Sequence, residues 1–251
     1  MDAKALAGVD VVINLAGAGI ADKRWTAQRK KELLDSRLDS LSTLSEQLSV
    51  LEKKPALFIG ASAVGYYGDR GAERLSESSS PGTGFLSEVT TKWEASTARV
   101  AEQHERSVIL RIGIVLSKNG GALKEILKPA ALGSYGYFGD GSAYYAWIHI
   151  DDICKIIQTQ IEDSSYAGTY NATAPEPVTI KSLVKAAKEA KGGWGLLMPV
   201  PVMGLKLVLG EMTHMLTDSM RAVPERLMNE GYAFEHSDPV AAIKDILDRG
   251  V

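Results

Sequence analysis

The sequence predicts an α/β protein with a mainly parallel sheet and a smaller, mainly helical carboxyl-terminal part. Three apolar segments, at residues 9–16, 56–63 and 107–116, are rich in β-branched residues and too continuously hydrophobic for strands with one face in water. Such segments are typical of strands covered on both faces. Helical patterns lie between them, and this alternation of strand and helix is the order of a parallel sheet with right-handed crossovers.

Composition limits the class of protein and its partners. The 251 residues are 45% hydrophobic and 24% charged, which is enough for one main domain with an appended part. A formal net charge of -3 leaves no basic stripe for nucleic acid. No segment reaches the ~18 consecutive apolar residues of a membrane span, and the amino terminus lacks a secretory pattern. The single cysteine, Cys154, cannot form a disulfide within the chain, which fits a reducing compartment. Together these observations predict a cytoplasmic protein without nucleic-acid or membrane partners.

The first strand and helix are expected near the amino terminus. Residues 3–8 are expected to end a helix, and strand 9–16 then ends in the small residues Ala16–Gly19. Small residues let a ligand approach the backbone, or they form a tight turn. Thr26 is the expected cap of a helix of roughly twenty residues. Its leucines recur at helical spacing: Leu33, Leu34, Leu38, Leu41, Leu44 and Leu48.

The most informative stretch is the second strand together with the residues directly after it. Strand 56–63 runs into Ser62-Ala-Val-Gly-Tyr-Tyr-Gly68, so hydroxyls and glycines come at its carboxyl end. Open α/β sheets bind their ligands at that end of the strands. The polar loop 69–84 is too long for a simple connector and is a candidate substrate loop. A helix at 85–105 then leads to the third strand, 107–116.

The second half is less regular. The expected elements are a helix at 122–132, a loop at 133–146 flanking a pocket, a short strand from Trp147 leading into a helix, a strand at 169–174 and a helix from Pro177 to about Lys191. Asp151 or Asp152 lies near the amino end of its helix, where a carboxylate is favoured. Gly192-Gly193 is expected to be a hinge, and the tail 199–251 to hold two or three helices and a turn at Gly231. We therefore divide the chain into residues 1–191 and 192–251.

Two kinds of chemistry are disfavoured by residue spacing. The four histidines, at positions 104, 149, 214 and 236, show no metal-ligand spacing, so no metal site is predicted. For His149, a satisfied core position is the expected role. Gly60-Ala-Ser62-Ala-Val64 lacks the second glycine of a nucleophile elbow, which makes a Ser-His-Asp hydrolase the weaker alternative.

Several motifs carry a resemblance to a known family. Asn14-Leu-Ala-Gly17, the stretch from Ser62 to Gly68, Leu110–Leu116 and Trp147–Asp152 occur in the order seen in extended short-chain dehydrogenase/reductases. The chain more closely resembles the bacterial YfcH-type epimerase-family proteins. The motifs that carry this closer resemblance are Asn14–Trp25, Ser36-Arg37, Gly65–Asp69, Gly120–Leu123, Asn171–Val178, Leu209-Gly-Glu211, Val223-Pro224 and Gly231–Phe234.

The resemblance implies a Rossmann-like doubly wound domain that binds NADP or NAD, with a substrate pocket beside the carboxyl-terminal part. The residues then expected to line the cofactor are Leu15, Ala16, Gly17, Ala61, Ser62, Ala63, Arg111, Ile112 and Gly113. Ser62 takes the place of the serine that hydrogen-bonds the reacting oxygen in relatives. A hydroxyl there stabilises the charge that develops on a carbonyl oxygen in the transition state.

One departure from the family pattern concerns the acid/base group. Typical members place Tyr and Lys four residues apart on one helix, so that the ammonium lowers the pKa of the phenol. No tyrosine here has a lysine at that spacing. Tyr66 or Tyr67, helped by Arg37 or Lys92, is the expected substitute. Arg24, Arg37 and Lys92 are expected either to contact substrate or to be ordinary surface groups.

The other departure is the absence of a GxxGxxG turn, which in this fold seats the cofactor pyrophosphate. The resemblance implies that about fifty residues and three strands are missing before the first strand. Strand 9–16 would then be an edge that recruits a second copy, so a homodimer is expected through it. Weak or absent dinucleotide binding is also expected. The leading function is an NAD(P)-dependent oxidoreductase or nucleotide-sugar-epimerase-like protein of unknown substrate, and the alternative is a non-catalytic Rossmann-like scaffold or regulator.

Overall fold

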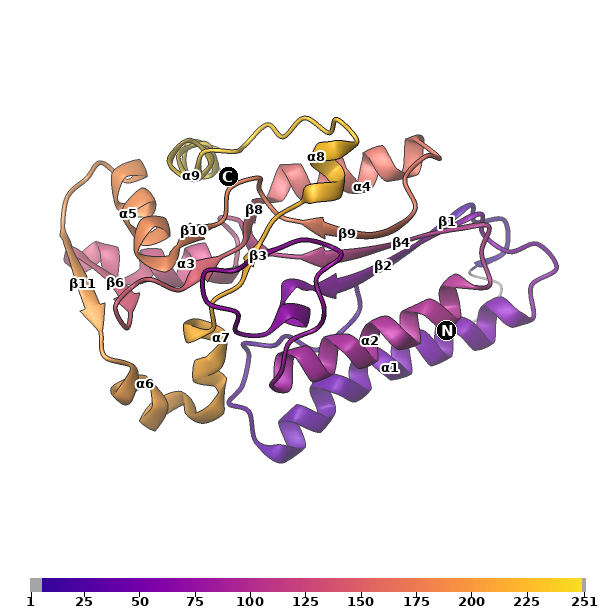
Figure 1. The fold of residues 1–251 in the computed structure, drawn as a ribbon, viewed down its shortest axis with the longest axis horizontal. Helices are drawn as coiled ribbons and strands as arrows, with labels where there is room; N and C mark the ends of the chain where they lie inside the picture. The colour runs from indigo at the N-terminus through magenta and orange to yellow at the C-terminus, as the bar shows by residue number, and fades with distance from the viewer. Residues whose placement is uncertain (1–5, 250–251) are drawn as a thin grey trace.

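A four-stranded parallel sheet forms the centre of the protein (Figure 1). The structure is a computed structural model in which residues 6–249 are described, so the first part of the helix end expected at residues 3–8 lies outside the described residues. The sheet order is β1-β2-β4-β9. Its strands are β1 (Val11–Asn14), β2 (Leu57–Ala63), β4 (Arg106–Ile112) and β9 (Gly168–Ala172). The predicted Rossmann-like parallel sheet is thus present.

Helices cover both faces of this sheet. The long helices α1 (Ala27–Ser49) and α2 (Phe85–Ala101) lie on one face, and α4 (Ile150–Glu162) and α8 (Glu225–Asn229) on the other (Figure 1). The buried core on the α1 and α2 side includes Leu41, Leu48, Phe58 and Trp93. The core on the other side includes Leu57, Ile59, Leu110, Ile156 and Leu227. Apolar side chains on both faces explain why the strands read as continuous hydrophobic runs.

The first helix begins where the sequence predicts. The Thr26 hydroxyl accepts a hydrogen bond from the backbone N–H of Arg29 at 3.1 Å and so satisfies a donor at the helix start. The second helix ends earlier than predicted, at Ala101 instead of residue 105.

The predicted strand 107–116 is wrong, because the chain leaves the sheet at Gly113. β4 ends at Ile112, and β5 (Ile114–Leu116) pairs with β8 (Trp147–His149) in a separate two-stranded ladder. A Cβ atom on residue 113 would lie 2.5 Å from the Ala146 carbonyl oxygen, so only glycine fits between these backbones. The next N–H, that of Ile114, donates to that same carbonyl at 2.7 Å.

The predicted helix 122–132 and loop 133–146 also need correction. The helix is α3 (Gly121–Leu127), followed by a 3₁₀ turn at Lys128–Leu132. Pro129 has no N–H for the next α-helical hydrogen bond, which explains the change of helix type. The expected loop contains two strands, β6 (Ser134–Phe138) and β7 (Tyr144–Tyr145).

The carboxyl-terminal segment is interleaved with earlier parts of the chain. β11 (Leu196–Val200) pairs in parallel with β6, and β12 (Arg221–Ala222) pairs with β3 (Arg74–Leu75). The remaining elements are β10 (Val178–Thr179), α5 (Ile180–Ala190), α6 (Val202–Leu209), α7 (His214–Thr217) and α9 (Pro239–Asp248). The division after residue 191 stays a prediction, and strands from both sides of it pair with each other.

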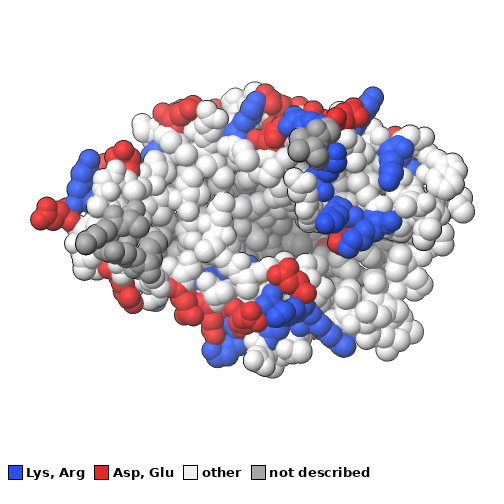
Figure 2. All heavy atoms as spheres, turned by 180° about the vertical axis from the view of Figure 1, so that it is seen from behind, with Lys and Arg blue, Asp and Glu red and all other residues white. Residues whose placement is uncertain are grey.

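The carboxyl ends of the parallel strands point toward the middle of the molecule (Figure 1). Figure 2 shows the molecule from behind the view of Figure 1. That face is hollowed near its centre, and few charged residues line the floor of the hollow. β1 has a neighbouring strand on one side only within residues 6–249, and Ile13 on it is 42% exposed. Within the same residues, no helix combines the length and hydrophobicity that a membrane crossing requires.

Candidate cofactor and substrate site

The loop after β1 presents exposed residues at the carboxyl edge of the sheet. Leu15, Ala16 and Gly17 are all exposed. The Asn14 side-chain oxygen accepts hydrogen bonds from the Ala16 N–H at 3.2 Å and from the Ser40 hydroxyl at 3.3 Å. These contacts fix the inner side of the loop to α1 and leave its outer side open to a ligand.

Arg37 supports the same loop from α1. One terminal nitrogen of its guanidinium donates to the carbonyl oxygens of Leu33 at 2.7 Å and Ala18 at 3.2 Å. Its carbon Cζ lies 4.8 Å from the centre of the Trp93 ring. Burial lowers the pKa of Arg37, and the nearby Arg29 lowers it further.

The other two predicted substrate residues, Arg24 and Lys92, are both exposed. Arg24 is exposed and packs against Gly210 of the carboxyl-terminal segment, where an added Cβ would lie 2.9 Å from its guanidinium. Lys92 is exposed on α2 and, among the described residues, makes no hydrogen bond to either tyrosine of the motif.

Ser62 lies at the end of β2, but its hydroxyl does not face open space. The residue is 2% exposed, and its hydroxyl donates to Oε1 of Glu94 at 2.5 Å. Glu94 also accepts two hydrogen bonds of 2.9 Å from Arg111, a bidentate pair. The Ser62 hydroxyl proton is therefore already used in a hydrogen bond to Glu94.

A second hydroxyl of the motif is committed in the same way. Arg111 donates to the Tyr67 oxygen at 3.0 Å, and Tyr67 donates to the Asn171 side-chain oxygen at 2.7 Å. Asn171 in turn donates to the Val223 carbonyl at 2.8 Å. Burial raises the pKa of Tyr67 to about 12, although Arg111 opposes the shift. At neutral pH Tyr67 is a protonated donor that already has its acceptor.

Tyr66 differs from its neighbour in having a free phenol. It is partly exposed, and its hydroxyl makes no hydrogen bond to any residue within 6–249. The Arg111 carbon Cζ lies 3.5 Å from the centre of the Tyr66 ring, so a cation rests against the π face. Of the two tyrosines, Tyr66 is the one whose hydroxyl is available to a ligand.

The register of the sheet brings the remaining predicted residues together. Ser62 lies opposite Arg111 on the neighbouring strand, and Ala63 lies opposite Ile112. Ala61 is buried, whereas Ala63, Ile112 and Gly113 are partly exposed at the edge.

The loop 69–84 closes the β4 and β9 end of the sheet. The Glu77 carboxylate accepts a hydrogen bond of 3.0 Å from the Asn171 N–H, and the Glu77 carbonyl accepts one of 3.2 Å from Arg111. Arg226 of α8 donates to the Thr169 carbonyl at 2.9 Å and to the Tyr170 hydroxyl. Burial raises the pKa of the Glu77 carboxyl. Side chains and loop thus fill the space beyond these two strands.

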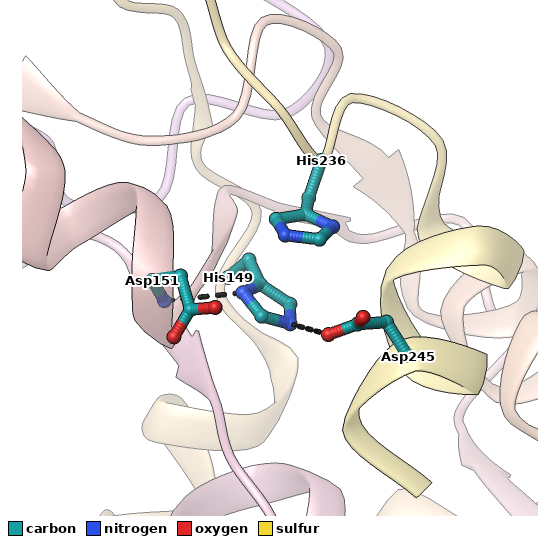
Figure 3. Close-up of side chains that lie close together, drawn as sticks. All are labelled: His149, Asp151, His236 and Asp245. Carbon is teal, nitrogen blue, oxygen red and sulfur yellow. Dashed lines mark hydrogen bonds and ion pairs between the residues drawn. The ribbon is translucent and has the colours of Figure 1, made fainter. Parts of the chain in front are cut away.

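A separate polar cluster was not predicted from sequence. His149, Asp151, His236 and Asp245 bring potential ligand atoms within 4.8 Å of one another (Figure 3). The two imidazoles stack with their centres 3.7 Å apart. The fold joins groups that are far apart in the chain, so sequence spacing carried no signal.

The cluster's hydrogen bonds favour an ionic clamp over a metal centre. His149 Nδ1 accepts the Asp151 N–H at 3.1 Å, so the neutral ring carries its proton on Nε2, 3.3 Å from Asp245 (Figure 3). A metal on Nε2 would need that proton on the other nitrogen. Arg249 already pairs with both carboxylates, at 2.8 Å in the case of Asp245. Burial lowers the pKa of His149, and the neighbouring His236 lowers it further.

A cavity lies away from these groups. Its volume is about 610 Å³, and its walls come from the 69–72 loop, the turn between β6 and β7, and the start of α6. None of the predicted catalytic or cofactor residues lines it. The exposed strand-end edge is therefore the better candidate for the cofactor.

The chain is similar to known proteins over most of its length. The family model described as "NAD dependent epimerase/dehydratase family" matches residues 2–172, and the "Domain of unknown function (DUF1731)" model matches residues 200–246. Epimerase family protein SDR39U1 from Mus musculus is 35% identical over 241 residues, covering 95% of this chain and 82% of its own. The chloroplastic homologue from Arabidopsis thaliana is 33% identical, covering 96% and 69%.

Solved structures agree with this assignment. The structure of human epimerase family protein SDR39U1 (isoform 2) with NADPH has a TM-score of 0.88 at 28% identity and covers 99% of this chain and 87% of that one. A nucleoside-diphosphate sugar epimerase from Corynebacterium glutamicum has a TM-score of 0.77 at 32% identity, covering 98% of this chain and 47% of that one. The chain belongs to the NAD-dependent epimerase/dehydratase family, as an extended short-chain dehydrogenase/reductase with a DUF1731 carboxyl-terminal domain.

Proposed function

We propose that the protein is an NADPH-using oxidoreductase or epimerase-like enzyme acting on a small molecule, with the cofactor lying across the carboxyl ends of β1, β2 and β4. The observation that carries this proposal is the exposed Leu15–Gly17 backbone, held from behind by α1. A protein of the same fold, covering 99% of this chain, has been solved with NADPH. Carboxyl-terminal strand ends are also where such sheets bind nucleotides.

The residues take different parts in this proposal. Leu15, Ala16 and Gly17 pack against the nucleotide, and Ala63 and Gly113 leave room for the nicotinamide end. The cofactor supplies hydride chemistry when bound. Tyr66 exchanges a proton with the substrate oxygen, because its hydroxyl is free and Arg111 lies against its ring. Ser62 and Arg111 hold the floor of the site through Glu94.

A non-catalytic scaffold is the second candidate, and one observation favours it. Two of the three hydroxyls that the sequence suggests for catalysis, those of Ser62 and Tyr67, donate to internal acceptors. A protein that had lost catalytic turnover would keep such hydrogen bonds because they stabilise the fold. It would still bind the dinucleotide at the strand ends, either normally or with weakened affinity.

Titration of NADPH fluorescence tests the proposal directly. Saturable binding by the wild type is expected, and Ala16→Glu should weaken it at least tenfold because it places a carboxylate beside the nucleotide phosphates. Leu132→Glu is a matched control, since Leu132 is 87% exposed and lies outside the strand-end edge. Equal affinity in the wild type and Ala16→Glu would reject the proposed cofactor position. Absence of binding by the wild type would reject NADPH use and favour the scaffold.

A further inference from the structure

Arg37 is a half-buried cation to which the structure gives no carboxylate. No Asp or Glu within residues 6–249 pairs with it, and its only hydrogen bonds there, both from Nη1, go to the carbonyls of Leu33 and Ala18. The donors on Nε and Nη2 make no hydrogen bond within that part of the chain. We infer that Arg37 is the anchor of an anion-binding site that takes a phosphate or pyrophosphate group at the loop after β1.

Other buried or half-buried arginines make the contrast clear. Arg111 is paired with Glu94, and Arg226 lies 3.2 Å from Glu230. Arg106 lacks a carboxylate, but it donates to three carbonyls around the carboxyl end of α4, the negative end of a helix. Arg37 has neither kind of compensation, and burial together with repulsion from Arg29 lowers its pKa. A bound anion would supply the missing negative charge.

The position of Arg37 matches the exposed backbone of the proposed crevice. A Cβ atom on Gly17 would lie 3.1 Å from the guanidinium carbon and from Cγ of Arg37. The glycine therefore lets the cation come up directly behind the exposed loop. The Trp93 ring, 4.8 Å from the guanidinium carbon, adds a cation–π contact that helps to hold Arg37 in place.

The free edge of the guanidinium suits phosphate better than a single acceptor. Nε–H and one Nη2–H point in parallel and form the two-donor edge that binds two oxygens of one phosphate. The inference rests on the proposed function for the source of the phosphate, which is then the cofactor. A phosphate carried by the substrate offers the same chemistry, and competition between pyrophosphate and NADPH separates the two sources.

Arg29 provides a matched control for the experiment. It anchors the next carbonyl of the loop, that of Gly19, at 2.6 Å, just as Arg37 anchors Ala18. Its charge is already neutralised by Glu32 at 2.7 Å and by Asp22 at 3.7 Å. Arg29→Met thus removes loop support without removing an unpaired charge, whereas Arg37→Met removes both.

The test measures binding of inorganic pyrophosphate and of NADPH by calorimetry, at low salt and at about tenfold higher salt. Arg37→Met should weaken the binding of pyrophosphate by about 10–100-fold and flatten its salt dependence, as expected for loss of a charge-assisted pair. Arg29→Met should change affinity by less than about threefold and keep the salt dependence. Arg37→Lys, which keeps the charge without the two-donor edge, should fall between the wild type and Arg37→Met.

The outcomes separate the two proposals. If Arg37→Met binds both NADPH and pyrophosphate as tightly as the wild type does, the anion site is rejected while the proposed function stands. Pyrophosphate binding through Arg37 without any NADPH binding supports the site and rejects NADPH use. If pyrophosphate binds through Arg37 and displaces NADPH, the phosphate is the cofactor's, and if both bind together it is the substrate's. If the wild type binds neither probe, both proposals fail.

Discussion

The two sides of the sheet's carboxyl edge differ in how their polar groups are satisfied. Beyond β4 and β9, Arg111, Glu94, Tyr67 and Asn171 bind one another, and loop 69–84 covers them. Beyond β1, residues 15–17 are exposed, and no carboxylate within residues 6–249 pairs with Arg37 beneath them. The polar groups on the closed side are satisfied within the protein, whereas we propose that a ligand satisfies those on the open side. This difference supports our proposal that the cofactor binds on the β1 side.

The largest effect is expected from Glu94→Gln, which disrupts the hydrogen-bonded network on the closed side. The exposed fractions of the Glu94 and Arg111 side chains are 13% and 6%, so the variant leaves a buried guanidinium without its counter-charge. The free energy of unfolding should fall by about 3–5 kcal/mol. Urea unfolding followed by circular dichroism measures it. Glu102→Gln, at the exposed residue that directly follows the same helix, should change the value by less than about 0.5 kcal/mol. A similar small change in Glu94→Gln would show that the network does not stabilise the fold.

Tyr67→Phe is expected to have a smaller effect on the same side. Removing the hydroxyl leaves the Asn171 oxygen without its donor, at a cost of about 1–3 kcal/mol. The pKa of Tyr67 is raised to about 12 from an ordinary value of 10.0, so its share of the stability is present below pH 10 and is lost as the pH rises through 12. The difference between wild-type and variant unfolding free energies should shrink across that window.

Tyr66→Phe is the control for this pair, because the Tyr66 hydroxyl has no hydrogen bond within the described residues to lose. Its unfolding free energy should stay within about 0.5 kcal/mol of the wild type. If the difference in unfolding free energy between the wild type and Tyr67→Phe did not vary with pH, this would contradict the conclusion that burial raises the pKa of Tyr67.

Ile13→Lys probes the open side with the smallest effect on folding. We propose that the β1 edge pairs with a second copy of the chain, since an exposed apolar edge recruits another strand. Because Ile13 is 42% exposed, the unfolding free energy should change by about 0.5 kcal/mol or less, while the dimer dissociation constant rises at least tenfold. Sedimentation velocity over a range of concentrations measures the dimer. Ile161→Lys, on α4 and 38% exposed, should leave association unchanged. A wild type that stays monomeric throughout would reject the proposed pairing.

Much of the fold was predictable because it depends on local patterns. Continuous apolar runs predicted β1, β2 and β4, and Thr26 with its leucine repeat predicted α1. The break after Ile112 was not predictable, because it arises from the close approach of Gly113 to Ala146, which lies between β7 and β8.

The candidate site was predictable in position but not in detail. The strand-end residues do meet as the motifs suggest, since neighbouring parallel strands share one edge. Glu94 was missed because nothing in its own helix shows that Arg111 lies opposite it. The commitment of the Ser62 proton to Glu94 depends on that same contact.

The pairing of β12 with β3 and of β11 with β6 has a consequence for how the chain folds. During synthesis β3 and β6 emerge long before their partner strands, so each waits with unpaired backbone groups until the carboxyl-terminal segment arrives. Contacts between distant parts of a chain form slowly because a long loop must be closed first. Docking of the last segment is thus expected to be the late, rate-limiting phase of refolding, after the central sheet has formed.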